Sequence, residues 1–538
     1  LEGVLTDNGY AYAKVRRAAD VDLVQQVASL GYWVDAGPQA RFGEIKVSGL
    51  GGIPESQVRR TLDLHAGEPY SRSELESAER ALLDLGVFSS VSVQPQLQPL
   101  VSNEPPASSQ PRDVVPIEVK LQQSRFRSLR LGGGLQIDSQ RTDLHLVAGW
   151  EDRNFLGGLR TLQVEFVPGG VIFPTRLPDL ETPERLLPQA RVRLEFRQPG
   201  FLEARTAGVL RAEASLAPVL LSPEHGAPIL GYRDLRTSAG LERSLFWRLN
   251  GTLSQNVQVS DPFSYAGTLD ADLNTAVVSY PELFLRLDAR NDRLEPTKGI
   301  YASTSLQVAG LGGDARDVKL QPELRGYVPI RRMTFAARGT LGLLFAENYG
   351  DTVVTNAFTG DGGTSRGAWV RDIQLMYLRG FFGGGPGSNR GYGQREIGPH
   401  GAVPFYNPGQ SSEDPTASCD TSENPGTGPL PSNCDLPLGG FSLWEASVEL
   451  RFPLLGPLRG AWFVDAGDVS PYQLSVRWDR PHLSTGLGLR YSTPIGPVRF
   501  DVGYRVPGLQ APASADESEP DELFGLPVAV SIGIGEPF

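Results

Sequence analysis

The chain has 538 residues and a formal net charge of −12. Its length exceeds what one ordinary hydrophobic core supports, and its acidic balance excludes a protein that binds nucleic acid through a basic surface. The sequence contains no apolar run near the ~18 residues that a membrane-spanning helix needs, which excludes a helical membrane protein. These properties leave open a multidomain protein or a β-barrel, whose lipid-facing side chains alternate with polar ones.

The first 122 residues predict small α/β domains. Ser71 and Glu74 form a capping box at the start of a helix that Gly86 closes. A shorter helix precedes it, and strands are expected on both sides of the helix pair, at 42–47, 88–93 and 114–121. Residues 41–122 therefore predict the order strand–helix–helix–strand–strand. Residues 1–40 contain a helix end and two strands, the back half of such an arrangement.

From Arg127 onward the sequence repeatedly alternates apolar and polar residues, the pattern of strands with two different faces. In one strand Leu320 and Leu324 oppose Lys319 and Glu323. Because the polar face carries repeated charges, a wet lumen explains this pattern better than the surface around a dry core does. Sixteen strands are predicted, at 127–138, 142–151, 159–168, 189–198, 207–217, 233–245, 248–260, 278–290, 299–309, 316–330, 332–345, 441–453, 457–466, 482–491, 497–505 and 526–535.

The predicted connections alternate in length. Most odd-numbered ones are long, for example 169–188, 218–232 and 346–440, whereas the even-numbered ones are shorter, for example 492–496. Long extracellular loops opposite short periplasmic turns are typical of outer-membrane barrels. The predicted fold is therefore α+β domains followed by a 16-stranded antiparallel transmembrane β-barrel over 123–538, with a long extracellular loop at 346–440.

Two segments near the C-terminus resemble motifs of one family. Residues 380–392, GFFGGGPGSNRGY, resemble the Arg-Gly-Tyr/Phe loop of the BamA/TamA superfamily of outer-membrane assembly proteins. Residues 490–504, with the turn Thr-Pro-Ile-Gly-Pro, resemble the penultimate strand pair of that family. The resemblance is greatest to the TamA branch, because the predicted turns are compact and because of the sequence of the chain's tail.

The N-terminal region is similar to the POTRA (polypeptide-transport-associated) domains of the same family. The phrases Gly67–Ser71 and Gly86–Phe88 match those domains. The resemblance implies that residues 41–122 form one POTRA domain and that residues 1–40 are the C-terminal part of another. No signal peptide is visible at Leu1, and we expect more POTRA sequence upstream of that residue.

The resemblance also assigns roles to the loop motif Arg390, Gly391 and Tyr392. Arg390 is expected at the tip of the long loop, folded back into the lumen, with Gly391 permitting close backbone approach and Tyr392 packing beside it. A desolvated arginine needs carboxylate partners, because an unpaired buried charge is strongly destabilising. Glu449 and Asp465 lie on the polar faces of their strands, and the family's pattern implies that they pair with Arg390.

Glycines mark the strands that would close the barrel, and two interpretations of them stay open. They either weaken a lateral seam that opens to an incoming strand, or relieve curvature as in any barrel. The last residue has the parity of the apolar face and resembles the C-terminal aromatic of such barrels. The predicted seam residues are Gly132, Gly133, Gly134, Gly533, Gly535 and Phe538.

Other chemistry is weakly indicated. Cys419 and Cys434 share one polar loop, where they form either a disulfide, as in an oxidising compartment, or two free thiols. Gly363–Gly367 fits the G-x-S-x-G pattern of hydrolases, but we expect neither an apolar strand before it nor a helix after it. The histidines show no metal-ligand spacing. We therefore expect no enzyme, no metal site and no cofactor.

The function implied is a non-enzymatic insertase or translocase of the TamA type in the bacterial outer membrane. The expected partners are the lipid bilayer, unfolded outer-membrane or secreted proteins, and a large TamB-like periplasm-spanning protein, with no nucleic acid. A BamA-like core assembly factor and a two-partner secretion pore are the alternatives within the family. A passive porin or the barrel of a lipase fusion would leave the POTRA segment and the Arg390 loop unexplained.

Overall fold

In the computed structural model the polypeptide is described over most of its length. The described residues are 1–22, 27–97, 113–137, 142–173, 182–219, 229–246, 248–355, 366–401, 405, 436–493, 497–507, 523 and 525–534.

The N-terminal region begins with helix α1 (Glu2–Asp7) and an antiparallel hairpin of β1 (Lys14–Asp22) and β2 (Val27–Asp35). A three-stranded sheet follows, in the order β3-β5-β4, with β3 parallel to β5. Its elements are β3 (Arg41–Ser48), α2 (Glu55–Leu62), α3 (Arg72–Asp84), β4 (Phe88–Pro95) and β5 (Val114–Gln123). This is the predicted strand–helix–helix–strand–strand order, and the Ser71 hydroxyl accepts a hydrogen bond from the Glu74 N–H as the capping box requires.

The face of α3 that packs into the domain core stabilises this domain. Leu82 is fully buried in the domain core, whereas its neighbour Leu83 is 41% exposed. We expect Leu82→Ala to lower the domain's free energy of unfolding by about 2–5 kcal/mol, because it leaves a cavity in a packed core. Hydrogen exchange of the α3 amides in the full-length protein measures this loss. Leu83→Ala is the matched control, and an equal loss of protection in both variants would contradict the prediction.

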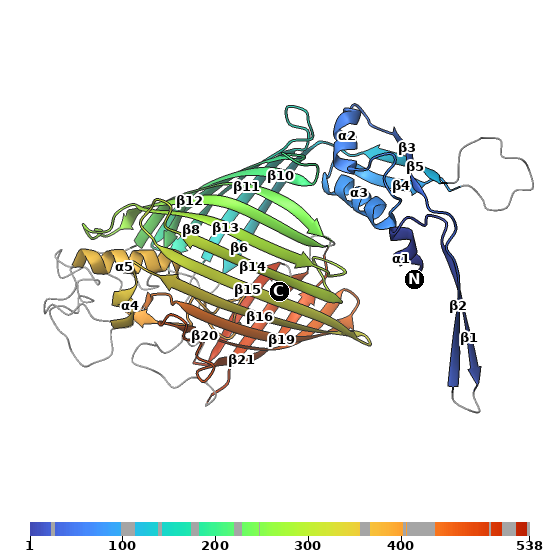
Figure 1. The fold of residues 1–538 in the computed structure, drawn as a ribbon. Coiled ribbons are helices and arrows are strands. Elements are labelled where there is room, and N and C mark those ends of the chain that lie inside the picture. The colour runs from blue at the N-terminus through green and yellow to red at the C-terminus, as the bar shows by residue number, and fades with distance from the viewer. Residues whose placement is uncertain are drawn as a thin grey trace, which may run out of the picture. The chain divides into compact units, whose positions relative to one another are not determined.

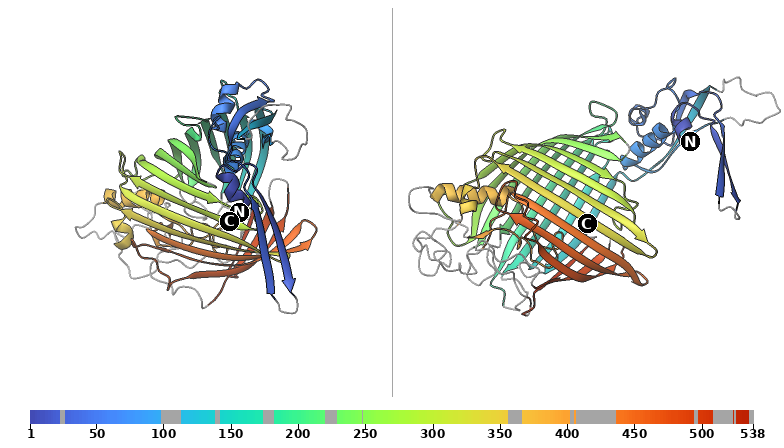
Figure 2. Two further views of the ribbon diagram at one scale, coloured as in Figure 1. Left: turned by 45° about the vertical axis from the view of Figure 1, so that its right-hand side comes forward. Right: turned by 60° about the horizontal axis from the view of Figure 1, so that its bottom comes forward.

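The remainder of the chain forms one 16-stranded antiparallel sheet that curves around a lumen (Figures 1 and 2). Its order follows the sequence from β6 to β23, interrupted only where β16 pairs with β19. The predicted 16-stranded antiparallel fold is confirmed. The strands are β6 (Arg127–Ile137), β7 (Thr142–Asp152), β8 (Thr161–Phe173), β9 (Arg185–Gln198), β10 (Thr206–Val219), β11 (Ile229–Phe246), β12 (Leu249–Ala266), β13 (Ala276–Asp288), β14 (Gly299–Ala309), β15 (Asp317–Ile330), β16 (Met333–Ala346), β19 (Ser442–Leu455), β20 (Leu458–Ser470), β21 (His482–Tyr491), β22 (Val498–Arg505) and β23 (Val528–Ile534).

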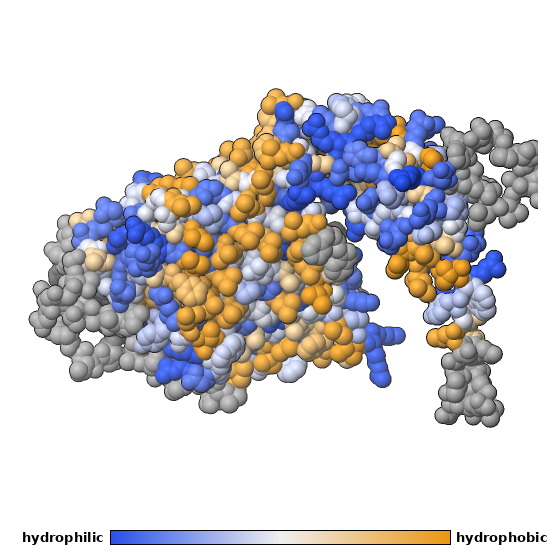
Figure 3. Space-filling view, viewed as in Figure 1, coloured by the Kyte–Doolittle hydropathy of each residue, from blue (hydrophilic) through white to orange (hydrophobic). Residues whose placement is uncertain are grey.

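The outer face of this sheet is apolar and its inner face is polar, the reverse of the arrangement in a soluble protein. On β15 the side chains of Leu324 and Val328 are 58% and 55% exposed, whereas Asp317 is buried. The space-filling view shows apolar residues spread over the outer wall (Figure 3). Apolar side chains outside and charged side chains inside are the arrangement that hydrocarbon around the wall and water in the lumen favour.

Several strands are longer than their alternation predicts. β8 continues to Phe173, β9 begins at Arg185, and β11 and β12 extend to Ile229 and Ala266, so the predicted loops 169–188, 218–232 and 261–277 are too long. The extension is stabilised by a small apolar cluster at that end of the sheet, which contains Val171, Phe173, Leu187 and Ile229. Packing of these side chains favours continued strand pairing where the sequence pattern has already ended.

The predicted loop 346–440 contains regular structure that was not predicted. Helix α4 (Asp351–Thr355) and helix α5 (Arg366–Arg379) precede the Arg390 motif, and the short strands β17 (His400–Gly401) and β18 (Leu436–Pro437) pair after it. α5 lies at one end of the barrel, beside α4 (Figure 1). Its side chains pack in a cluster with those of the strands, so burial by tertiary contacts stabilises a helix that has no clear amphipathic pattern.

Candidate functional site

Residues 381–397, which follow α5, fold into a compact hairpin-like segment inside the lumen, called the tongue below. Backbone bridges join Phe381 to Gly440 and Gly383 to Ile397, so both legs of the tongue are held. Gly384 has a φ of +90°, and a side chain there would approach the Gly393 carbonyl within 3.0 Å. A left-handed conformation in so narrow a turn requires glycine, which explains part of the glycine-rich sequence before Arg390.

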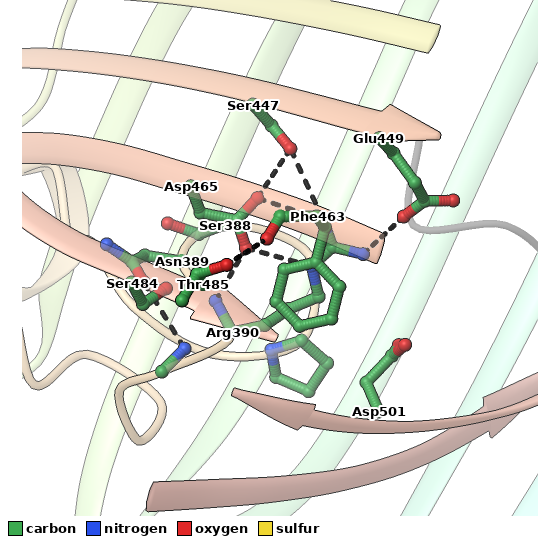
Figure 4. A network of polar contacts seen from close by, with 12 residues as sticks. Ser388, Asn389, Arg390, Ser447, Glu449, Phe463, Asp465, Ser484, Thr485 and Asp501 are labelled. Atoms are coloured by element: carbon green, nitrogen blue, oxygen red, sulfur yellow. Dashed lines mark hydrogen bonds and ion pairs between the residues drawn. The ribbon is translucent and has the colours of Figure 1, made fainter. Parts of the chain in front are cut away.

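Arg390 lies at the tip of this tongue and is 3% exposed. Its backbone N–H, its Nε and its Nη2 donate to the two Asp465 carboxylate oxygens at 3.0, 2.8 and 2.9 Å (Figure 4). Its Nη1 donates to Glu449 Oε2 at 2.5 Å. Charge-assisted bonds are roughly twice as strong as hydrogen bonds between neutral groups, and the forked geometry adds specificity. The structure thus places Arg390 against both carboxylates that the sequence had singled out.

Two further side chains, Ser447 and Phe463, complete the binding site of the guanidinium group. Together with Asp465 and Glu449 they form what we call the Arg390 seat. Ser447 Oγ accepts from Arg390 Nη2 at 3.4 Å and donates to Asp465 Oδ1 at 2.5 Å. The Phe463 ring faces the guanidinium carbon, which is 3.5 Å from the ring centroid. A buried cation over an aromatic face is attracted by the ring quadrupole. The seat is therefore complementary to an arginine in charge, in hydrogen bonding and in shape.

The network continues through residues for which the sequence analysis assigned no role. Arg451 Nε donates to Glu449 Oε1 at 2.8 Å, and Arg490 Nη2 donates to Glu449 Oε2 at 3.4 Å. Arg490 Nη1 also donates to Asp501 Oδ1 at 2.6 Å. Arg490 and Asp501 lie in the strand pair that carries the family resemblance, on the polar face of their strands. The alternation of polar and apolar residues along these two strands could therefore have identified both side chains as facing the lumen.

The ion pairs of this cluster join equal numbers of positive and negative groups. It contains three guanidinium groups and three carboxylates, and each of these side chains is at most 6% exposed. Buried charges are tolerated when each has a partner of opposite sign and good hydrogen-bond geometry. Removing one member therefore leaves another charge uncompensated, so the cluster acts as a unit that holds the tip against β19, β20, β21 and β22.

The residues beside Arg390 fix the tip further. Asn389 Nδ2 donates to the His482 carbonyl at 2.7 Å, and Ser484 Oγ donates to Asn389 Oδ1 at 2.5 Å. A side chain at Gly391 would lie within 3.0 Å of Ser484 Cβ, and one at Gly503 within 3.0 Å of the Arg390 carbonyl. The tip and the wall approach one another so closely that glycine is required on both surfaces.

Tyr392 is 2% exposed and packs beside the tip. Its ring meets the His482 imidazole edge-on, with the centroids 5.5 Å apart, and the Arg505 guanidinium lies 5.5 Å from its centroid. Arg505 Nη1 also donates to the Gly391 carbonyl at 3.3 Å. The Arg-Gly-Tyr motif is thus in contact with the wall through all three residues.

Of the predicted seam residues, Gly132, Gly133 and Gly134 lie on β6 and Gly533 lies on β23, the strands at the two ends of the sheet order. A side chain at Gly132 would meet open space, whereas one at Gly134 would lie within 3.0 Å of the His145 ring. Gly134 therefore accommodates a neighbouring side chain, a packing role independent of any seam. Gly533 pairs with Arg499 of β22, and Gly535 and Phe538 lie outside the described residues.

The remaining sequence signals are not among the described residues of this site. Cys419, Cys434 and Ser365 of the G-x-S-x-G segment lie outside the described residues. The expectation that no helix follows that segment is wrong, because α5 begins at Arg366 and is stabilised by its contacts with the wall. Within the described ranges, His, Cys, Asp and Glu do not form a group of three or more that could hold a metal ion. Nor is any described helix long and apolar enough to cross a membrane.

The fold and the site together define an outer-membrane β-barrel with an α/β domain and an arginine-tipped loop in its lumen. Residues 279–521 match the family model described as the Omp85 superfamily domain, and residues 40–123 match the POTRA model, described as a surface antigen variable number repeat. The chain belongs to the Omp85 superfamily. It is an integral outer-membrane protein of the protein insertion and transport class, with its POTRA domain in the periplasm.

Solved structures share this fold. BamA from Haemophilus ducreyi lacking POTRA domains 1–3 aligns with a TM-score of 0.56 at 18% identity, over 99% of this chain and 92% of that one. CdiB from Acinetobacter baumannii aligns with a TM-score of 0.55 at 13% identity, over 98% of this chain and 78% of that one. CdiB from Escherichia coli aligns with a TM-score of 0.51 at 12% identity, over 98% and 81%. At these identities the likeness is one of fold.

Proposed function

We propose that this protein inserts other proteins into the outer membrane, without enzymatic chemistry, at a lateral seam between β6 and β23. One observation supports this most: the Arg390 tip is seated on β19 to β22, the strands that lead directly to β23. The tongue is bonded to strands up to β22, whereas the contacts of the Arg390 tip given above do not include β23, which pairs with β22 through its backbone. Exposed backbone groups on an edge strand are a template for pairing with an incoming strand.

The contents of the lumen favour insertion over free passage. Helix α5 packs against the inner wall near the extracellular end, and the Arg390 tongue occupies the lumen beside β19 to β22. A tongue held in the lumen by a buried charge cluster occupies space that free passage of solutes would need. A substrate that pairs with a strand edge needs a rigid frame and does not need an open pore.

Within the family we propose the TamA type, with a TamB-like periplasm-spanning partner. Compact turns support this choice: two residues separate β11 from β12, β15 from β16, and β19 from β20. A BamA-like assembly factor and a two-partner secretion pore are the competing assignments, and the likeness to BamA and CdiB structures is compatible with each of them.

Reconstitution tests the general function. The full-length protein is placed in liposomes, an unfolded outer-membrane barrel is added, and folding is followed by heat-modifiable gel mobility and protease protection. We expect faster folding than in empty liposomes or in liposomes that hold an unrelated porin. Equal rates in all three would contradict an insertase. Accumulation of a secreted protein inside the vesicles without barrel folding would instead favour a secretion pore.

Partner capture tests the assignment within the family. We expect affinity purification from crosslinked native membranes to recover a very large, β-rich periplasmic protein. Recovery of outer-membrane lipoproteins together with unfolded barrel precursors would favour the BamA-like alternative. If neither is recovered, the two-partner secretion pore becomes the better assignment.

A further inference from the structure

A second buried arginine holds the other end of the same loop. Arg379 is the last residue of α5 and is 5% exposed. Its Nε and Nη2 donate to the two Asp317 carboxylate oxygens at 3.0 and 2.6 Å. This is the forked geometry that Arg390 makes with Asp465, but the carboxylate belongs to β15 rather than to the strands that receive the tip.

The main chain of the same residue is also held by β15. Lys319 Nζ donates to the Arg379 carbonyl at 2.7 Å and lies 4.3 Å from the centroid of the Phe381 ring. The last carbonyls of a helix lack partners within the helix, and a cation beside them interacts favourably with the helix dipole. Asp317 and Lys319 are two residues apart on one strand and therefore share a face. One strand thus holds the end of α5 by both its side chain and its backbone.

The surroundings fix this pair of contacts. Gln307 Oε1 accepts from Arg379 Nη1 at 2.8 Å, and the Tyr349 hydroxyl donates to Asp317 Oδ2 at 2.8 Å. Upstream of Arg379, Val370, Ile373 and Met376 of α5 are at most 2% exposed within a cluster that also includes residues of the wall. The helix is therefore seated on the inner wall along its length and anchored at its C-terminal end.

We propose that Asp317 and Lys319 are positioning residues that latch α5 against the inner wall, and that this latch makes the extracellular end of the lumen a barrier to ions. The latch acts separately from the Arg390 seat, because the two use different strands and share no residue. It concerns permeability and does not depend on which proteins the barrel inserts.

Conductance of the full-length protein in planar bilayers, in potassium chloride, tests the latch. Asp317→Asn keeps the side-chain volume and leaves the Arg379 charge unpaired, and Lys319→Met removes the cation at the helix end. We expect each to raise the fraction of time spent in conducting states on the order of ten-fold, since loss of a buried ionic contact shifts such an equilibrium at least that far. The double variant Asp317→Asn with Arg379→Gln removes both charges of the pair, and should be less conductive than Asp317→Asn alone.

Asp261→Asn is the matched control, because it removes the carboxylate of an exposed pair with Arg233, in which the side chains are 41% and 62% exposed. Only protein that shows heat-modifiable mobility is used, so loss of folding cannot be mistaken for opening. Wild-type conductance in both latch variants would overturn the proposal. An equal rise in conductance in Asp261→Asn would also overturn the proposal, because the rise would then reflect a general loosening of the barrel. The insertion assay reports on the seam independently, so failure of one proposal is distinguishable from failure of the other.

Discussion

We expect Arg390→Ala to lower the barrel's free energy of unfolding by roughly 3–5 kcal/mol and to abolish insertion activity. The substitution leaves Asp465, which is 1% exposed, without the cation that satisfies both of its oxygens. Glu449 keeps Arg451 and Arg490, so Asp465 is the member that loses most. Urea unfolding in phospholipid vesicles, followed by tryptophan fluorescence, measures the stability, and the liposome assay measures the activity.

The matched control for this change is Arg193→Ala. Arg193 pairs with Glu213 across two wall strands at 2.6 Å, but its side chain is 48% exposed. An exposed pair contributes about 1 kcal/mol at most, because water solvates both charges after the pair is broken. If the two variants lost similar stability, the burial of the Arg390 cluster would carry no energetic consequence and its proposed role would be wrong.

Gly503→Ala is expected to unseat the tip without removing any charge. The added methyl group would lie within 3.0 Å of the Arg390 carbonyl, and backbone on both sides leaves neither atom free to move away. Forcing a methyl group into a packed contact costs about 1–3 kcal/mol, and here the movement that relieves it pulls the guanidinium away from its carboxylates. We expect a large loss of insertion activity and greater protease sensitivity in the tongue.

Gly326→Ala is the control for this prediction. Gly326 also lies in a wall strand, β15, but an added methyl group there meets open space. Activity close to wild type in Gly326→Ala and a loss in Gly503→Ala would show that the close approach itself matters. Equal behaviour of the two variants would contradict the account of the seat.

The two predictions are coupled. If Gly503→Ala acts by displacing Arg390, then the double variant should be scarcely less stable than Arg390→Ala alone. A tip that has already lost its guanidinium contacts can move its main chain away from the methyl group without breaking further ion pairs. Additive losses would mean that Gly503 acts on the sheet itself. The double-mutant cycle therefore separates a defect in the tip from a defect in strand pairing.

The strands were predictable because their signal is local. Alternation of period 2 can be recognised within a few consecutive residues. Strands β14 (Gly299–Ala309) and β21 (His482–Tyr491) therefore have the bounds that the pattern predicts. The capping box at Ser71 is local in the same way. The pairing of Arg390 with Glu449 and Asp465 could be anticipated because strand parity put both carboxylates in the lumen and the family motif supplied the arginine.

Contacts between distant segments were decided by the tertiary structure alone. Arg379 meets Asp317 across 62 positions of sequence, and Arg490 meets Glu449 across 41, so neither pair has a local pattern. Helix α5 is buried against residues of β11, β13 and β14, which the curvature of the sheet brings to it, and a helix covered in this way shows no single apolar stripe. Alternation determined which residues face the lumen, and only the curvature of the sheet around the loop determined which of them meet.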